Sequence, residues 1–119
     1  MFYITTSFSP IRVVKGDKST VVLEIKIRND YPDSKLASVM VKAPFSLGFD
    51  SVGLFRETRR RIGYLKPGME KTVPIQLFPK TNIGEGNYNI DIKVYSHKER
   101  YDKNEKEFNL NASLRVISK

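Results

Sequence analysis

Apolar and polar residues alternate with a period of two along most of the chain, and this pattern constrains the fold more than any other feature. In its clearest stretch, residues 20–29, every second position holds an aliphatic side chain: Val21, Leu23, Ile25 and Ile27. Successive side chains of a strand point to opposite faces, so this stretch is predicted to have one buried and one solvated face. No stretch carries a convincing 3.6-residue pattern over three helical turns, and we therefore predict an all-β chain.

The same alternation predicts the other strands: residues 2–8 and 11–15, which count as one strand or two, then 36–43, 59–66, 72–77, 86–95 and 107–117. We expect the chain to pass from one sheet to another at Pro10, which breaks the first strand. Pro74 predicts that its strand lies at a sheet edge, or at least that its nitrogen faces outward, because proline has no N–H to donate. Pro67-Gly68 is predicted to form a turn, since glycine tolerates positive φ at the second central position.

Two stretches break the alternation. Residues 45–58 are rich in apolar side chains, but glycines interrupt any regular period. We expect a crossing loop that places three aromatic rings over one end of the fold: Phe45, Phe49 and Phe55. The polar stretch 96–106 is predicted to be a long hairpin loop, in which the single histidine, His97, is exposed.

Length and composition allow one domain. At 119 residues and 39% hydrophobic composition, the chain has material for one core and no room for a second. It contains no internal repeat and no low-complexity linker, so residues 1–119 are expected to form a single domain. Seven to eight short strands separated by turn signals are typical of an immunoglobulin-like antiparallel β-sandwich, which is the predicted fold.

Three segments carry a resemblance to a known family. They are Val14-Lys-Gly-Asp17 followed by residues 21–29, Leu65-Lys-Pro-Gly68 followed by residues 73–77, and Gly86-Asn-Tyr88 followed by residues 89–94. These segments resemble the Gly-containing turn before a strand ending in Asn, the Leu-x-Pro-Gly turn, and the penultimate strand beginning Gly-x-Tyr of CARDB-type immunoglobulin-like modules. The resemblance spans about residues 10–117. It implies a non-enzymatic module that binds other proteins or polysaccharide, and it transfers no site residues, because the matching positions are structural.

The residues that catalysis and metal binding require are scarce. The chain has no cysteine and one histidine, which removes disulfides, thiol nucleophiles and cysteine-ligated zinc. His97 is not accompanied by a Gly-x-Ser-x-Gly elbow, and Gly84-Glu-Gly86 lacks the Lys-Ser/Thr of a phosphate-binding loop. We therefore expect no enzymatic activity, no catalytic residue, no metal site and no cofactor.

The charged feature that stands out is the basic segment 56–61, with Arg56, Arg59, Arg60 and Arg61, followed by Tyr64. Arginine binds phosphate and carboxylate through paired N–H groups, so these residues are candidate contacts to a polyanion or to a partner protein. The competing interpretation is a basic edge strand whose charge prevents strand-to-strand aggregation. Consecutive strand residues point to alternating faces, so the three adjacent arginines share one surface only if they lie in a loop.

These observations favour a non-enzymatic binding module that mediates protein–protein interaction through a sheet edge or through end loops. Segments 45–61 and 96–106 are the expected contact regions, because connecting loops carry function on a rigid scaffold. The expected partner is another protein or a second copy of the chain in a homodimer. The alternative is binding of nucleic acid or another polyanion through the basic segment, which the net charge of +8 supports.

No apolar run approaches the ~18 residues that a membrane-spanning helix needs. The first residues lack the basic and apolar regions of a signal peptide. Together with the absence of cysteine, this favours the cytoplasm.

Overall fold

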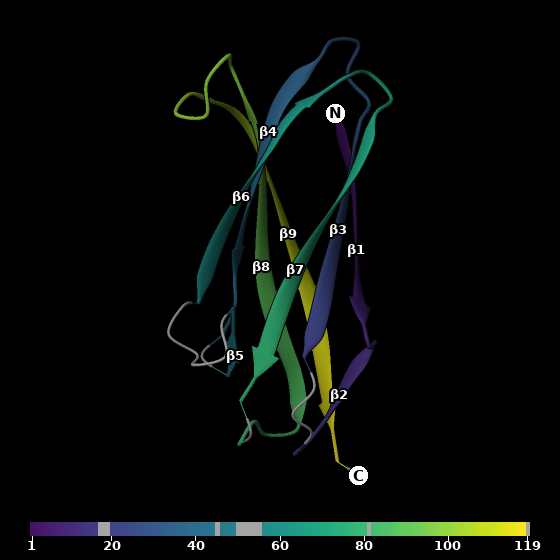
Figure 1. Cartoon of the computed structure of the whole chain (residues 1–119), viewed down its shortest axis with the longest axis vertical. Helices are drawn as coiled ribbons and strands as arrows, with labels where there is room; N and C mark the ends of the chain where they lie inside the picture. The colour runs from purple at the N-terminus through teal and green to yellow at the C-terminus, as the bar shows by residue number, and fades with distance from the viewer. Residues whose placement is uncertain (17–19, 45, 50–55, 81, 119) are drawn as a thin grey trace.

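The computed structural model describes residues 1–16, 20–44, 46–49, 56–80 and 82–118, and in them it contains nine strands and no helix (Figure 1). The predicted all-β class is confirmed. In chain order the strands are β1 (Phe2–Ser9), β2 (Arg12–Val14), β3 (Val21–Asn29), β4 (Lys35–Lys42), β5 (Leu47–Gly48), β6 (Glu57–Leu65), β7 (Glu70–Pro79), β8 (Gly86–His97) and β9 (Asn104–Ile117). The count exceeds the predicted seven or eight because it includes two very short strands. β2 has three residues and β5 has two.

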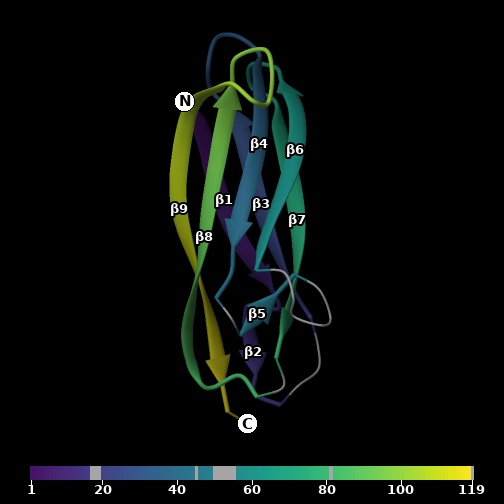
Figure 2. The ribbon, with the colours of Figure 1, turned by 90° about the vertical axis from the view of Figure 1, so that its left-hand side faces the viewer.

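The strands form two sheets, as in a β-sandwich. Sheet A has the order β1-β3-β7-β5, and sheet B has the order β2-β9-β8-β4-β6 (Figure 2). Neighbouring strands are antiparallel except for β2 and β9, which pair in parallel. The chain changes sheet between β1 and β2, on either side of Pro10, as the sequence predicted.

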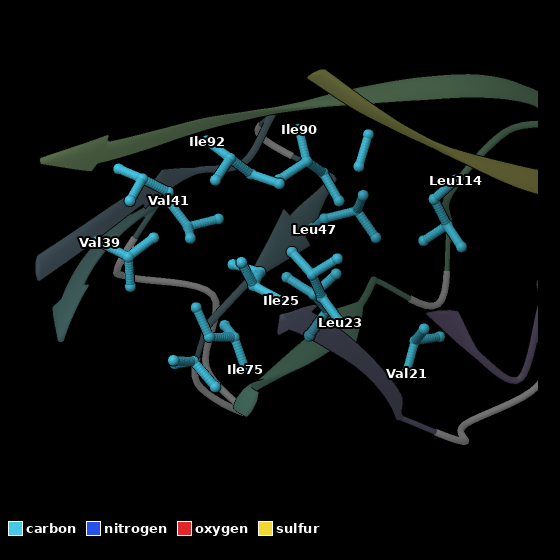
Figure 3. Packing of buried hydrophobic residues seen from close by; sticks show 14 of the residues in the cluster. Val21, Leu23, Ile25, Val39, Val41, Leu47, Ile75, Ile90, Ile92 and Leu114 are labelled. Carbon is cyan, nitrogen blue, oxygen red and sulfur yellow. The ribbon is translucent and has the colours of Figure 1, made fainter. Parts of the chain in front are cut away.

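The core fills the space between the inner faces of the two sheets (Figure 3). Val21, Leu23, Ile25 and Ile27 of β3 are at most 1% exposed, and β8 contributes its own buried row. Full burial of one such side chain stabilises the fold by about 1.5–3 kcal/mol. The strong alternation in residues 20–29, 86–95 and 107–117 therefore does mark the strands of the core, as predicted.

Strand β7 has a free side over most of its length. It pairs with β3 through residues 70–77, whereas β5 reaches only Phe78 and Pro79. Within the described residues, the segment of β7 around Pro74 thus lies at a sheet edge, as its sequence predicted. Proline is tolerated there because an edge has no second neighbour to receive an N–H.

The turn between β6 and β7 packs against the end of β3. Gly68 has a φ of 79°, the left-handed conformation predicted for this turn, and its N–H donates to the carbonyl of Asn29 at 2.7 Å. The Asn29 N–H donates in turn to the Met69 carbonyl at 3.0 Å. The Pro67-Gly68 turn is thereby anchored to sheet A.

The stretch predicted as a long hairpin loop is shorter than expected. β8 continues to His97 and β9 begins at Asn104, which leaves only residues 98–103 between them. The prediction was wrong because Ser96 and His97 are polar yet buried, so their polarity concealed a strand end.

The stretch predicted as a crossing loop contains one described strand, the two-residue β5. Leu47 is fully buried there, and Phe49 packs partly buried against the core as expected. Phe45 and Phe55 lie outside the described residues. Over the described ranges, no helix is long and apolar enough to cross a membrane.

Candidate functional site

A hollow of about 480 Å³ lies on sheet B where β4, β6 and β8 meet the β8–β9 turn. These three strands are neighbours in the sheet, in the order β8-β4-β6 (Figure 2). The charged and aromatic residues that line the hollow include Arg59, Arg60, Arg61, Tyr95, His97 and Tyr101. We call this feature the basic hollow.

The strand register decides where the three arginines point. Arg59 pairs with Met40 and Arg61 pairs with Ser38, so both project from the outer face of sheet B. Arg60 pairs with the core residue Val39 and therefore projects from the other face. The register thus shows the alternation predicted for a strand, and all three arginines nevertheless line the hollow.

A register shift near the end of β6 sets the direction of Tyr64. Ala37 pairs with Gly63 while the next residue of β4, Ser38, pairs with Arg61, so Ile62 is an extra residue of the β-bulge type. Ile62 is buried, and Tyr64 is 58% exposed on the face that carries Arg61. Gly63 has a φ of 91°, a conformation that glycine adopts easily.

Two contacts join β6 to the β8–β9 turn. The Arg61 guanidinium lies 4.8 Å from the ring centroid of Tyr101, a cation–π contact. The Tyr64 hydroxyl donates a long hydrogen bond, 3.5 Å, to the Glu99 carbonyl. Parts of the two segments that the sequence marked separately, 45–61 and 96–106, are therefore adjacent in space.

Arg56 lies apart from the other predicted site residues. Its carbonyl accepts a hydrogen bond from the N–H of Ala43 at 2.8 Å, beside the end of β6 where Lys42 pairs with Glu57. It is exposed and does not line the basic hollow. Three of the five predicted contact residues, Arg59, Arg60 and Arg61, thus line the hollow. Tyr64 does not line it but bonds the β8–β9 turn, and Arg56 lies at the opposite end of the strand.

The arginines differ in their ion pairing. Arg59 lies 3.5 Å from the Glu57 carboxylate, a weak and exposed pair. Arg60 donates to the Thr58 hydroxyl at 2.6 Å, and neither Arg60 nor Arg61 pairs with a carboxylate of the described residues. The basic hollow consequently keeps exposed positive charge that is available to an anionic group.

His97 is a buried residue of this site, which corrects the prediction that it is an exposed loop side chain. It is 6% exposed, and its Nε2 shares a 2.6 Å hydrogen bond with the Ser38 hydroxyl. Its ring stacks on Tyr95 at 5.9 Å and meets Tyr101 edge-on at 5.3 Å. His97 lies on the outer face of β8 with Tyr95, so the period-two pattern could have extended the strand to this residue but did not indicate its burial.

Burial lowers the pKa of His97 below its ordinary value of 6.5, because the charged imidazolium loses its hydration. Polar groups of Asn104 and Lys103 oppose this effect without overcoming it. Burial also raises the pKa of Tyr95, with the neighbouring Glu107 carboxylate acting in the same direction. At neutral pH His97 and Tyr95 are therefore uncharged, and the positive charge of the hollow comes from Arg59, Arg60 and Arg61.

The Ser38–His97 pair is half of a serine-nucleophile arrangement, which also needs a group that orients the imidazole. Among the described residues, no carboxylate is hydrogen-bonded to Nδ1 of His97. Asp102, which lines the hollow, pairs with Arg100 at 3.3 Å. The described ranges also hold no group of three His, Asp or Glu side chains arranged to bind a metal ion.

The chain matches no protein-family model, and a search of curated proteins finds no significantly similar sequence. The basic hollow and strand β6 are therefore the features of the chain from which a function can be inferred.

Proposed function

We propose that the chain is a non-enzymatic binding module with an immunoglobulin-like arrangement of strands, and that it binds a partner protein through the basic hollow and strand β6. The observation that carries this proposal is the junction of the arginine-bearing edge strand with the β8–β9 turn. Arg61, Tyr64 and Tyr101 meet at that junction.

The sheet orders support the immunoglobulin-like part of the proposal. In that fold one sheet has strands A-B-E-D and the other has G-F-C with an added C′. Here β1-β3-β7-β5 corresponds to the first order and β9-β8-β4-β6 to the second. One departure is that β5, which occupies the place of D, precedes β6 in the chain.

A tyrosine at the start of β8 supports the same assignment. The Tyr88 hydroxyl donates to the Gly84 carbonyl, four residues earlier, at 2.6 Å. Immunoglobulin-like domains carry such a tyrosine corner near the start of strand F, two residues before a core position. Ile90, two residues after Tyr88, is a fully buried core residue.

The CARDB-type resemblance draws support from another contact. Its Asn-terminated strand and its Leu-x-Pro-Gly turn correspond to β3 and to Leu65–Gly68, which are bonded together through Asn29. The resemblance would make the chain an adhesion or adaptor module.

The composition of the hollow supports protein binding. Arginine, tyrosine and methionine are enriched in the buried centres of protein interfaces, where arginine and tyrosine often dominate the binding energy. All three types line this hollow: Arg61, Tyr101 and Met40. The net charge of +8 would speed encounter with an acidic partner.

The test is chemical cross-linking of the wild-type chain to its partners, followed by mass spectrometry. The double variant R59E/R61E should lose the cross-linked partner. A matched control, R12E/K26E, reverses two exposed cations away from the hollow and should retain it. Capture of the same partner in equal amount by both variants would contradict the proposal.

Polyanion binding is a second candidate, favoured by the absence of carboxylate pairing at Arg60 and Arg61 in the described residues. Exposed Tyr64 offers a ring on which a base could stack. A gel-shift titration with single-stranded DNA at two salt concentrations tests this candidate. Affinity that falls steeply with salt would support it, and absence of a shift at low salt would remove it.

A further inference from the structure

Among the described residues, one side of strand β6 has no strand partner. It is the last strand of sheet B, and among the described residues it pairs only with β4. A free edge presents unpaired N–H and C=O groups, which are a template for another extended chain. Near the bulge, the Ile62 carbonyl already accepts a hydrogen bond from Lys71 Nζ at 3.2 Å. Within residues 57–61 the Arg59 carbonyl also accepts a side-chain hydrogen bond, from Arg60 Nη1 at 3.2 Å. Both residues are exposed, so an incoming strand can displace this bond, and residues 57–61 form the accessible part of the edge.

The arginines flank this edge on both faces. Arg59 and Arg61 project on the outer face, and Arg60 projects on the other, where it bonds Thr58. An incoming strand would also alternate its side chains, so each of three consecutive residues would meet an arginine on its own face. Directly opposed charges of opposite sign stabilise a strand pair by about 0.2–1 kcal/mol each. The alternation that puts Arg60 on the opposite face of the sheet from Arg59 and Arg61 thus suits the three arginines to an added strand.

A second copy of the chain fits this edge poorly. Antiparallel pairing of β6 with another β6 centred on Arg60 would oppose arginine to arginine, and like charges opposite one another destabilise a strand pair. Charge complementarity instead favours consecutive acidic residues.

We infer that β6 accepts an extended acidic segment of the partner protein as an additional strand of sheet B, with consecutive carboxylates placed opposite Arg59, Arg60 and Arg61. This inference rests on the proposed function, because it specifies how the partner occupies the same surface.

The test uses a blocked peptide, Val-Thr-Glu-Glu-Glu-Thr-Val, whose palindromic sequence matches the arginines in either strand direction. Binding to the full chain is followed by fluorescence anisotropy. A peptide of the same sequence with all three glutamate nitrogens N-methylated should bind about tenfold more weakly. Alternate N–H groups of a strand point to the same side, so in either register one or two ladder hydrogen bonds are lost. The variant R60E should weaken binding of the unmodified peptide about fivefold.

Four outcomes would overturn the inference or its basis. If the N-methylated peptide binds as tightly as the unmodified one, the contact is made by charge alone; the added strand is then wrong and the proposed function stands. Absence of binding at millimolar peptide would overturn the added strand directly. If a lysine version of the peptide binds equally well, charge complementarity is wrong. Tighter binding of oligothymidylate than of any peptide would contradict the proposed function as well.

Discussion

Asn29 donates a hydrogen bond from Nδ2 to the backbone carbonyl of Leu65, 36 residues later in the chain, at 2.7 Å. Both residues are fully buried, and they belong to different sheets. The same Nδ2 donates to the Asp33 carbonyl at 2.9 Å, and Oδ1 accepts from the Tyr31 N–H at 2.9 Å. Every donor and acceptor type of this amide is used, so Asn29 connects the two sheets at one end of the fold.

Replacing Asn29 with alanine should destabilise the fold by about 3 kcal/mol, because the Leu65 carbonyl and two other backbone groups lose their partner. Asn29→Asp should cost at least as much, since a carboxylate would face carbonyl oxygens that need a donor. Urea unfolding measures both changes. The exposed Asn87→Ala serves as the control and should change the free energy of unfolding by less than about 0.5 kcal/mol. An Asn29→Ala variant as stable as this control would contradict the assigned role.

The protonation of His97 should make the fold less stable in mild acid. Its pKa is lowered in the folded state from 6.5, so below pH 6.5 the unfolded chain binds more protons than the folded chain. The contribution is fully present above pH 6.5 and is lost as the pH falls from there through the lowered pKa. Thermal unfolding at several pH values between 5 and 7.5 measures it.

The control for this pH dependence is His97→Gln, which removes the only histidine. The variant should have a nearly constant melting temperature between pH 5 and 6.5. The pKa values of Asp30 and Glu105 are lowered from 3.8 and 4.5 by Arg28 and Lys35, so those groups act in a lower pH range. An unchanged pH profile in the variant would show that His97 is not the responsible group.

Tyr88→Phe should cost about 0.5–1.5 kcal/mol, because the half-buried ring remains while the 2.6 Å hydrogen bond to Gly84 is lost. The exposed Tyr3→Phe is the matched control, and it should leave the free energy of unfolding almost unchanged. Equal stability of the two variants would remove the tyrosine corner from the account.

Local patterns were sufficient to predict most of the strands. The buried rows of β3, β8 and β9 follow from period-two alternation, and Pro10 and Pro74 marked the change of sheet and the edge correctly. These features were predictable because each depends on residues that are adjacent in sequence.

Features that depend on distant pairing were missed. Ser38 and His97 are 59 residues apart, so nothing in the sequence near His97 indicated the hydrogen bond that accompanies its burial. The bulge at Ile62 and the contact of Arg61 with Tyr101 likewise require the partner strand and the β8–β9 turn to be in place. The arginines were identified as a feature from the sequence, but the surface that they form was not.

The central claim is that β6 and the basic hollow form the binding surface for an acidic protein segment. The most direct measurement is an anisotropy titration of the Val-Thr-Glu-Glu-Glu-Thr-Val peptide against three chains: wild type, R59E/R61E and R12E/K26E. We expect R59E/R61E to weaken binding about tenfold or more, while the control, with the same net charge, weakens it less than about twofold. Equal weakening by both variants would show that only net charge matters and would contradict a dedicated site on β6.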